Sequence, residues 1–295
     1  MLTEKEFALL SYLAAHPGLP SQNQMSAETR ITMNMVNSTL QMLLDKGLVV
    51  QSKGITPDGI QALEPYRVKR AVFLAAGLGS RMVPVTLKTP KPLVRVNGVR
   101  IIDTLLDAVL AAGVKEIYII RGYLGEQFDQ LLYKYPMIQF IDNLLYNKAG
   151  AISSVLCAGE RVSAAYMMES DLLLKNPALI TPYQYESNYL GIKVERTDDY
   201  YFKLRNGYIN EVGVGGTNCY QTVGITYWTK QDGLRLARDV AEEFDKPGGR
   251  ERTCGEITQV LHAGEYNIGA RECSFDDVVE IDTFNELKAI DPTYG

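Results

Sequence analysis

The chain has 295 residues, of which 46% are hydrophobic and 22% charged, and its formal net charge at pH 7 is −5. This length and composition suit one large domain or two unequal ones with an ample core. The negative charge disfavours general attraction to nucleic acids or anionic membranes, and no apolar segment is long enough to span a bilayer.

Residues 1–66 predict a small, mainly helical domain. The expected elements are helices over 3–15, 22–29 and 33–46, a hairpin around 49–54 and a helix over 57–63. Thr3 is the expected N-cap of the first helix and Gly47 the expected C-cap of the third. Three helices and a small hairpin resemble a winged helix-turn-helix of the kind found in bacterial regulators. Residues 64–67 form the expected boundary with a second domain over 67–295.

The charges of residues 1–66 disfavour an independent DNA-binding role. This segment has four basic side chains against six acidic ones, and the expected recognition helix over 32–41 has no Lys or Arg. DNA-binding proteins take most of their affinity from phosphate neutralisation, although Asn34, Asn37 and Gln41 could read adenine edges. The sequence therefore favours a regulatory or dimerisation module, with a homodimer as one consequence.

From Val68 onward strands and helices alternate, which predicts a Rossmann-like α/β domain with a mostly parallel sheet and helices on both faces. The expected strands of its first part cover 68–75, 116–121, 137–142 and 165–168, and the expected helices 101–112, 125–135 and 151–161. After Leu174 longer strands follow, over 190–196, over 201–212 with a hairpin turn at Asn206-Gly207, and over 221–229. Helices over 232–244 and 256–262 and a β-α pair over 268–290 complete the domain.

The most informative segment follows the first of these strands. Residues 74–82 read LAAGLGSRM and residues 89–93 read TPKPL. Small residues and glycines after a strand let backbone N–H groups approach a ligand closely. Arg81 and Lys91 add positive charge at the same place. The combination suits a nucleoside triphosphate.

Two other phosphate-binding loops are excluded. A Walker loop needs a Lys-Ser/Thr pair that does not follow Gly79 at the required spacing. A dinucleotide fingerprint needs Gly or Ala where Met82 stands and an uninterrupted helix, which Pro84 prevents. Residues 74–93 instead resemble the N-terminal motif of nucleotidyltransferases, LAAGxG[ST]R[LM]xPxTxxxPKxL, almost position by position.

Two acidic pairs provide candidate metal ligands. Glu169 and Asp171 end an expected strand, and Glu280 and Asp282 repeat the same spacing near the C-terminus. On extended backbone this spacing puts both carboxylates of a pair on one face, and ligands of parallel sheets bind beyond the carboxyl ends of the strands. An isolated pair is commonly a solvated strand end. Two pairs together with a triphosphate loop favour Mg²⁺, which prefers oxygen ligands.

Residues 68–295 resemble the bacterial choline-phosphate cytidylyltransferases. The resemblance rests on residues 74–93, on RGYLGEQF over 121–128, on the Glu169-x-Asp171 pair and on VEID over 279–282. It implies CTP as a substrate, Mg²⁺ as cofactor on Asp171 and Asp282, and phosphates bound by Arg81 and Lys91. The nucleotide-binding residues are then expected to be Ala75, Ala76, Gly77, Gly79, Ser80, Gly122, Tyr123 and Ser154.

The expected acceptor site departs from that family. Residues 148–154 read KAGAISS where the family often has an Asn-Asn pair near the base, and Cys254-Gly255-Glu256 replaces a Tyr-Trp-Asp motif, losing the ring and keeping the acid. Aromatic faces bind quaternary ammonium groups. The candidate acceptor residues are Tyr200, Tyr227, Trp228 and Glu256, although core packing is the commoner role for any single aromatic residue. Phosphocholine, phosphoethanolamine and 2-aminoethylphosphonate all remain open as acceptors.

The sequence thus predicts an Mg²⁺-dependent transfer of a cytidylyl group from CTP to a small phosphorylated acceptor, with release of pyrophosphate. The acceptor oxygen is already ionised, so positioned cations rather than a general base are the main catalytic device. Arg81 is assigned to the β- and γ-phosphates and Lys91 to the reacting centre. A sugar-1-phosphate nucleotidyltransferase is one alternative, and a transcription regulator that only senses CTP or CDP-choline is another.

Cysteine spacing and the N-terminus predict a cytoplasmic location. The four cysteines show no paired spacing and are expected to be buried, reduced thiols. The first residues lack the basic start and apolar stretch of a signal peptide.

Overall fold

The computed structural model describes residues 1–295, which divide into two compact units. The first unit comprises Met1–Arg67 together with Tyr183–Tyr185, and the second comprises Val68–Pro182 and Glu186–Gly295. The short segment Tyr183–Tyr185 packs with the first unit because its aromatic rings meet those of that unit. The Tyr185 ring lies 5.5 Å from the Tyr66 ring and 5.3 Å from the Phe7 ring.

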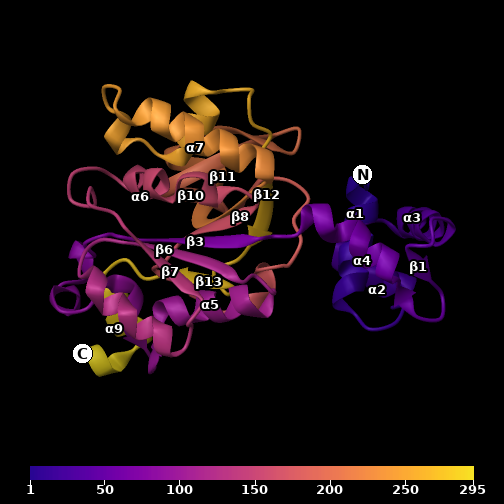
Figure 1. Cartoon of the computed structure of the whole chain (residues 1–295), viewed down its shortest axis with the longest axis horizontal. Helices are drawn as coiled ribbons and strands as arrows, with labels where there is room; N and C mark the ends of the chain where they lie inside the picture. The colour runs from indigo at the N-terminus through magenta and orange to yellow at the C-terminus, as the bar shows by residue number, and fades with distance from the viewer. The chain divides into compact units, whose positions relative to one another are not determined.

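The first unit consists of helices and one small hairpin (Figure 1). Its elements are α1 (Glu4–Ala15), α2 (Gln22–Thr29), α3 (Met33–Asp45), β1 (Val49–Val50), β2 (Gly54–Ile55), α4 (Pro57–Leu63) and η1 (Glu64–Tyr66). β1 pairs with β2 in antiparallel register. Every element expected in this segment is present, with ends that agree to within about one residue, the ordinary scatter of helix boundaries.

Helix α1 begins at a reciprocal cap formed by Thr3 and Glu6. The Thr3 hydroxyl accepts a hydrogen bond from the backbone N–H of Glu6, and the Glu6 carboxylate accepts one from the backbone N–H of Thr3 at 2.9 Å. Lys46 donates to the other oxygen of Glu6. Burial opposes ionisation of Glu6, but the bonds from Lys46 and Thr3 hold the pKa of its carboxyl below the ordinary value.

Glu6→Gln tests this cap because the amide keeps an acceptor for Thr3 and loses the charge. A carboxyl whose pKa is lower in the folded state stabilises at pH values above 4.5, and this contribution is lost as the pH falls through the folded-state pKa. We expect the variant to lose roughly 1 kcal/mol of unfolding free energy at pH 7, and the difference from wild type to vanish near pH 3. Urea unfolding followed by circular dichroism at both pH values measures this, with exposed Glu4→Gln as the control. An equal loss at both pH values would contradict the assigned role of the charge.

The second unit is built on a seven-stranded sheet with the order β10-β12-β11-β8-β3-β6-β7. The strands are β3 (Arg70–Ala75), β6 (Glu116–Arg121), β7 (Ile138–Asp142), β8 (Ala165–Glu169), β10 (Asn188–Arg205), β11 (Tyr208–Trp228) and β12 (Gly269–Cys273). β3 is parallel to both β6 and β8, and β6 is parallel to β7. β11 runs antiparallel to β8. The parallel half of the sheet confirms the architecture predicted from alternating strands and helices.

Helices cover both faces of this sheet. α6 (Ile152–Ala158) and α7 (Lys230–Phe244) lie on one face, and α5 (Ile101–Ala111) and α9 (Phe284–Ile290) on the other (Figure 1). Alternate residues of β3 enter the two cores, since successive side chains of a strand point to opposite faces. Phe73 packs in the core that contains α5, and Val72 in the core that contains α6 and α7.

Short elements complete the second unit. Two small antiparallel pairs are β4 (Arg95–Val96) with β5 (Val99–Arg100), and β9 (Leu172–Leu174) with β13 (Val278–Glu280). The short helical turns are η2 (Ser80–Met82), η3 (Val85–Leu87), η4 (Lys91–Leu93), η5 (Gly125–Tyr133), η6 (Gly159–Val162), η7 (Pro177–Leu179), η8 (Gly249–Glu251), α8 (Cys254–Glu256), η9 (Ile257–Leu261) and η10 (Pro292–Tyr294).

Three predicted helices are wrong in type or extent. The expected helix over 125–135 is the 3₁₀ helix η5, and the one over 256–262 consists of α8 followed by the π-helical turn η9. The expected helix over 151–161 ends at Ala158, because Gly159 adopts a φ of +54° that an α-helix cannot contain. Hydrophobic periodicity does not separate these tighter or wider turns from the α-helix.

The hairpin turn expected at Asn206-Gly207 is confirmed, because β10 and β11 pair in antiparallel register on either side of it. The breaks expected at 197–200 and 213–220 are wrong, because the two strands run on over 18 and 21 residues. Residues 213–220 lie outside the expected strands, yet they belong to β11, and their glycines make room for Tyr201. A Cβ atom on Gly213 would lie 2.9 Å from the Tyr201 ring, and one on Gly216 2.8 Å from it. Packing of a ring from the paired strand therefore overrides the low strand propensity of glycine.

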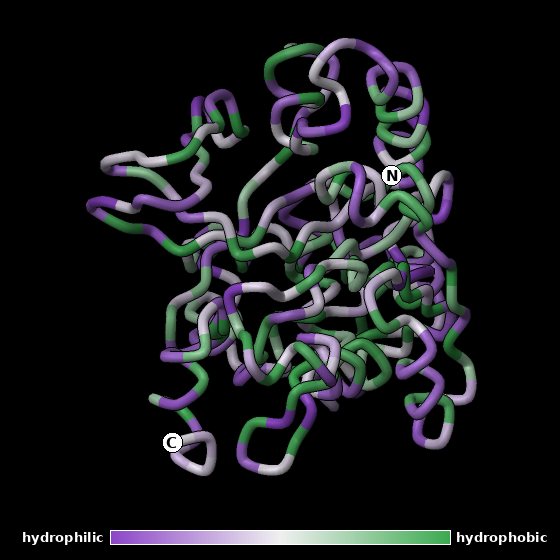
Figure 2. The backbone as a smooth tube through the Cα atoms, turned by 90° about the vertical axis from the view of Figure 1, so that its left-hand side faces the viewer, coloured by the Kyte–Doolittle hydropathy of each residue, from purple (hydrophilic) through white to green (hydrophobic).

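All four cysteines are free thiols, as predicted, but their expected burial is largely wrong. Cys219 is buried, whereas Cys157, Cys254 and Cys273 are half-buried. Hydrophobic and hydrophilic stretches are intermixed along the backbone (Figure 2). None of the helices combines the length and hydrophobicity needed to cross a lipid bilayer.

Candidate active site

The candidate site lies where the order of the parallel strands reverses. From β3 the chain continues to β6 and β7 on one side, whereas β8 pairs with β3 on the other. The ends of β3 and β8 are tied by the Ser170 hydroxyl, which donates to the Leu74 carbonyl at 2.7 Å. In open α/β sheets the crevice at such a reversal binds ligands. The glycine loop follows β3 here, and Glu169 ends β8.

The glycine loop is held against the Lys91 segment by Gly79. Gly79 has a φ of +61°, and a Cβ atom on it would lie 2.9 Å from Thr86 Cγ2 and 3.2 Å from Lys91 Cβ. The Thr86 hydroxyl donates to the Gly79 carbonyl at 2.8 Å. Ala75 and Ala76 are buried, whereas Gly77 and Ser80 are exposed and leave the outer face of the loop open. Glycine is therefore required at position 79 both for backbone conformation and for space.

Gly122 and Tyr123 support this loop from the end of β6. A Cβ atom on Gly122 would lie 2.7 Å from Tyr146 Cβ and 3.0 Å from Ala76 Cβ. The Tyr123 backbone N–H donates to the Ala76 carbonyl at 3.2 Å, and the Tyr123 hydroxyl donates to the Thr86 carbonyl at 3.0 Å. Both residues therefore contact the loop, and their observed contacts position its backbone.

Two glycine variants separate packing from ligand approach. Gly122→Ala should lower the free energy of unfolding by about 1–3 kcal/mol, because its methyl group overlaps Tyr146. Gly77→Ala should change stability by less than about 0.5 kcal/mol, since no atom lies within 4 Å of its Cβ position. It should nevertheless weaken nucleotide binding, because the added methyl covers the exposed loop backbone. Thermal unfolding and nucleotide titration measure the two effects, and a stable Gly122→Ala protein would contradict the packing argument.

The pairing of β9 with β13 brings the two acidic pairs together. Leu172 lies opposite Glu280, and the Ile281 backbone N–H donates to the Asp171 carbonyl. Ile281 is fully buried in a small apolar cluster with Met82. This cluster anchors Met82 and Ile281, the neighbours of Arg81 and Asp282. It therefore holds together two residues that are about 200 positions apart in the sequence.

Four residues predicted from the sequence meet beside this apolar cluster. Lys91 Nζ donates to Asp171 Oδ2 at 2.7 Å and to Asp282 Oδ1 at 2.8 Å, and Arg81 Nη2 donates to the same Asp282 oxygen at 2.8 Å. The Lys91 side chain is 10% exposed and that of Arg81 67% exposed. Burial opposes the charge on Lys91, but Asp171 and Asp282 raise the pKa of its ammonium above the ordinary value. Lys91 is therefore a buried cation and Arg81 an exposed one.

Two glutamates enlarge the acidic cluster. Carboxylate oxygens of Glu169, Asp171 and Glu280 lie within 4.8 Å of one another. Desolvation by surrounding protein atoms and repulsion from Asp171 raise the pKa of Glu169 to about 7 and that of Glu280 to about 9. The Glu169 side chain is nevertheless exposed to solvent. A cation bound among these carboxylates would offset their mutual repulsion and so lower the pKa of both glutamates.

The donor set fits a hard divalent cation. It consists of carboxylate oxygens, and Asp171 Oδ1 is buried without a hydrogen-bond partner. Sequence analysis noted the Glu280-x-Asp282 spacing but did not include Glu280 among the site residues. It also missed Gly224, where a Cβ atom would lie 2.7 Å from the Glu169 carboxylate. Only the strand pairing reveals both neighbours.

Ser154 takes part in a buried hydrogen-bond network. Its side chain is buried at the start of α6, and its hydroxyl accepts a hydrogen bond from Asn143 Nδ2 at 3.1 Å. Asn143 also donates to the Ser153 hydroxyl at 2.9 Å, and its own side-chain oxygen accepts from the Leu145 backbone. This buried network fixes the turn between β7 and α6. Asn143 was not anticipated from the sequence.

The residues proposed for the acceptor do not converge on the acidic cluster. Tyr227 and Trp228 are buried opposite Tyr166 and Ala165, at the amino-terminal end of β8, whereas Glu169 is at its carboxyl end. Trp228 packs in the core, which is the commoner role for such a residue.

The two remaining acceptor candidates lie at the surface. Tyr200 is 52% exposed on β10, next to Asp199, whose charge contributes to the raised pKa of Glu169 and Glu280. The Glu256 carboxylate accepts the Thr253 backbone N–H at 2.7 Å and so caps α8. Of the four candidates, Tyr200 is thus the aromatic residue left with an accessible ring.

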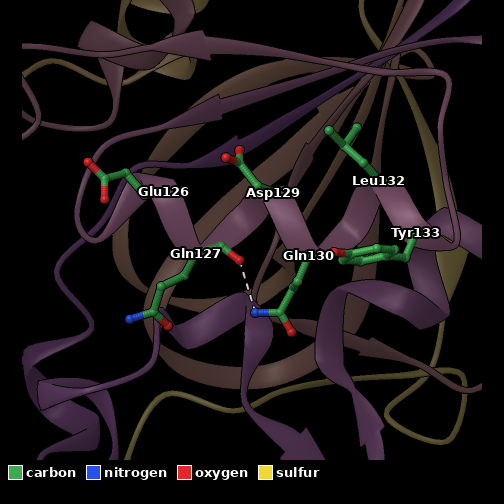
Figure 3. A pocket seen from close by; sticks show the side chains of 6 residues that line it. All are labelled: Glu126, Gln127, Asp129, Gln130, Leu132 and Tyr133. Carbon is green, nitrogen blue, oxygen red and sulfur yellow. Dashed lines mark hydrogen bonds between the residues drawn. The ribbon is translucent and has the colours of Figure 1, made fainter.

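A surface hollow lies elsewhere. It has a volume of about 650 Å³ and lies along η5 (Figure 3). Its lining residues are Glu126, Gln127, Asp129, Gln130, Leu132 and Tyr133. Gln130 donates to the Gln127 carbonyl at 2.9 Å, and none of the acidic-cluster or glycine-loop residues lines this hollow.

The site combines a glycine loop with acidic side chains that pair with Lys91 and Arg81, and it lies at the strand reversal of an α/β sheet. This fold and site are of the nucleotidyltransferase type. Residues 71–181 match the family model of the MobA-like NTP transferase domain. The chain is 34% identical over 228 residues to the 2-aminoethylphosphonate cytidylyltransferase of Lancefieldella rimae, an alignment that covers 76% of this chain and 92% of that protein. It is 26% identical over 224 residues to the choline-phosphate cytidylyltransferase of Haemophilus influenzae, covering 75% of this chain and 95% of the relative.

The solved structure of the CTP:phosphocholine cytidylyltransferase from Streptococcus pneumoniae has the same fold. It superimposes with a TM-score of 0.70 at 23% identity, covering 78% of this chain and 100% of that one. The chain belongs to the cytidylyltransferases of the NTP transferase family. The nucleotidyltransferase assignment made from residues 74–93 is thereby confirmed.

Proposed function

We propose that the protein is an Mg²⁺-dependent cytidylyltransferase that joins CTP to 2-aminoethylphosphonate and releases pyrophosphate. The observation that carries the proposal is the meeting of Lys91, Arg81, Asp171 and Asp282 at the end of β3 and β8. The relative from Lancefieldella rimae, whose length the chain covers to 92%, supports the choice of acceptor.

The proposed roles follow from charge. Asp171 and Asp282 would hold Mg²⁺, which supplies neutralisation of the triphosphate when bound. The backbone of Ala75–Gly79 and Ser80 receives the phosphates, Arg81 pairs with the β- and γ-phosphates, and Lys91 faces the reacting centre. The acceptor oxygen is ionised at neutral pH and attacks the α-phosphate without a general base, so these cations carry most of the catalysis.

The surplus of carboxylates supports an acceptor with a primary amine. Mg²⁺ usually takes one or two carboxylates. Glu169, Asp171 and Glu280 form a cluster of three, and Asp282 contacts the same lysine as Asp171, so Glu169 and Glu280 remain for the acceptor when the two aspartates hold the metal. A primary ammonium donates three hydrogen bonds to such carboxylates, whereas a trimethylammonium group has no N–H and needs aromatic faces. Tyr227 and Trp228 are buried in the core, so Tyr200 alone of the three aromatic candidates offers an accessible face. Phosphocholine is therefore the less favoured acceptor.

A pyrophosphate-release screen tests the proposal. CTP, UTP, ATP and GTP are each combined with 2-aminoethylphosphonate, phosphoethanolamine, phosphocholine and glucose-1-phosphate. We expect the largest kcat/KM for CTP with 2-aminoethylphosphonate, a smaller one for phosphoethanolamine and the smallest among amines for phosphocholine. Highest turnover with glucose-1-phosphate would establish the alternative of a sugar-1-phosphate nucleotidyltransferase. Nucleotide binding without any turnover, together with tight promoter binding, would establish a CTP-sensing regulator.

For residues 1–66 we propose a winged helix-turn-helix that serves in dimerisation or regulation. Helices α1 to α3, the β1–β2 hairpin and the absence of Lys and Arg from α3 support this assignment. Light scattering of the full chain should give a homodimer, and fluorescence anisotropy with promoter DNA should give only weak binding. Tight, salt-sensitive promoter binding would overturn the preference. Free cysteines and the use of CTP support a cytoplasmic location.

A further inference from the structure

The ammonium group of Lys91 bridges the two aspartates assigned to the metal. Lys91 Nζ lies 2.7 Å from Asp171 Oδ2 and 2.8 Å from Asp282 Oδ1. We propose that Lys91 occupies the metal position in the nucleotide-free enzyme, so that a divalent ion can bind tightly only after the triphosphate has drawn Lys91 away. This inference rests on the proposed function, because it takes Asp171 and Asp282 as the metal ligands.

The ammonium and a metal ion compete for the same electron pairs. Mg²⁺ binds carboxylate oxygens at about 2.0–2.1 Å, and the oxygens that it would use already accept the Lys91 protons. Burial reduces screening, so a divalent cation beside an unmoved ammonium would be strongly repelled. Lys91 itself is 8% exposed, and both aspartates accept its hydrogen bonds, so the ammonium stays between them until stronger partners are offered.

The backbone and the side chain of Lys91 differ in their freedom to move. Lys91 lies in η4 between Pro90 and Pro92, and its Cβ packs beside Gly79. The four-carbon stem beyond this fixed point can redirect the ammonium from the carboxylates towards phosphates held by the glycine loop. A movement of the side chain alone is therefore sufficient.

Arg81 strengthens the coupling. It donates to the same oxygen of Asp282 that Lys91 uses, and its side chain is 67% exposed. A triphosphate offers both cations stronger partners, so its binding releases Asp282 from two hydrogen bonds at once. By thermodynamic linkage, the nucleotide then raises the affinity for the metal by the factor by which the metal raises the affinity for the nucleotide.

Metal binding without nucleotide tests the inference directly. Titration of the full-length protein with Mn²⁺ alone, followed by electron paramagnetic resonance of free Mn²⁺, measures the affinity of the acidic cluster. Lys91→Met should bind Mn²⁺ at least about tenfold more tightly than wild type, because the competing charge is gone and the stem is retained. Lys91→Arg keeps a cation and should show no gain, and neither should Lys88→Met, which removes an exposed lysine of the same loop.

A second pair of measurements keeps the result interpretable. Asp282→Asn added to Lys91→Met should abolish the gain, which locates the bound ion between the two aspartates. If unpaired carboxylates destabilise Lys91→Met, Mn²⁺ should raise its thermal midpoint more than that of wild type. Unchanged or weaker Mn²⁺ binding by Lys91→Met, or a gain that survives Asp282→Asn, would overturn the inference. These assays contain no nucleotide, so they fail or succeed separately from the pyrophosphate-release screen.

Discussion

Asp171→Asn is expected to lower kcat/KM for cytidylyl transfer by about 10³-fold, and Asp282→Asn by a similar factor. Each substitution preserves the shape of the side chain and removes one of the two charges that hold Lys91. Under the proposed mechanism, the same charge holds the cation that neutralises the triphosphate. The measurement is pyrophosphate release with CTP and 2-aminoethylphosphonate at saturating Mg²⁺. Asp245→Asn is the matched control, because Asp245 is 82% exposed at the end of α7.

Stability measurements distinguish this loss from a folding defect. Repulsion from Asp171 contributes to raising the pKa of Glu169 to about 7 and that of Glu280 to about 9. A carboxyl with a raised folded-state pKa stabilises the fold below its unfolded value and loses that contribution as the pH rises through the folded one. Removing the Asp171 charge relieves this repulsion but also removes one partner of buried Lys91. The thermal midpoint of Asp171→Asn should therefore fall less steeply than that of wild type as the pH rises from about 7 to about 9. Loss of activity below tenfold in a stable variant would contradict the assignment.

The sequence predicts those parts of the site that local patterns specify. A strand followed by small residues and two cations predicts the glycine loop after β3, and Gly79 indeed packs against Lys91. Equal spacing in the two acidic pairs predicts that Asp171 and Asp282 act together, and both bond the same nitrogen atom. The glycine loop depends on neighbours within a few residues. The meeting of the two aspartates follows from the expectation that acidic pairs in a triphosphate-binding chain share one metal ion. They are therefore accessible without coordinates.

Long-range pairing sets the rest, and sequence patterns do not report it. Nothing near Glu280 in the sequence indicates that β13 pairs with β9 and brings its carboxylate to Asp171. The ring of Tyr201 keeps glycines inside β11 that local rules assign to a break. Trp228 has the chemistry of a ligand-binding residue, and only its position at the far end of β8 shows that it belongs to the core.

Lys91 and Arg81 should affect different steps, although both contact Asp282. Lys91→Met is expected to lower kcat by about 10²–10³-fold and to weaken CTP binding by less than about tenfold. Arg81→Met is expected to weaken CTP binding more than it lowers kcat. The dissociation constant is measured by calorimetry with a non-hydrolysable CTP analogue, and kcat by single-turnover pyrophosphate release.

The contrast follows from where charge develops during the reaction. A cation beside the reacting phosphorus stabilises the transition state more than the bound substrate, so its loss lowers kcat. A cation on the outer phosphates binds substrate and transition state almost equally, so its loss appears mainly in affinity. Burial reduces the solvent screening of the Lys91 charge, whereas Arg81 is exposed and screened by solvent. If the two substitutions have equal effects on kcat and on affinity, neither Lys91 nor Arg81 has the proposed position. Both side chains would then contribute only a general electrostatic attraction for the triphosphate.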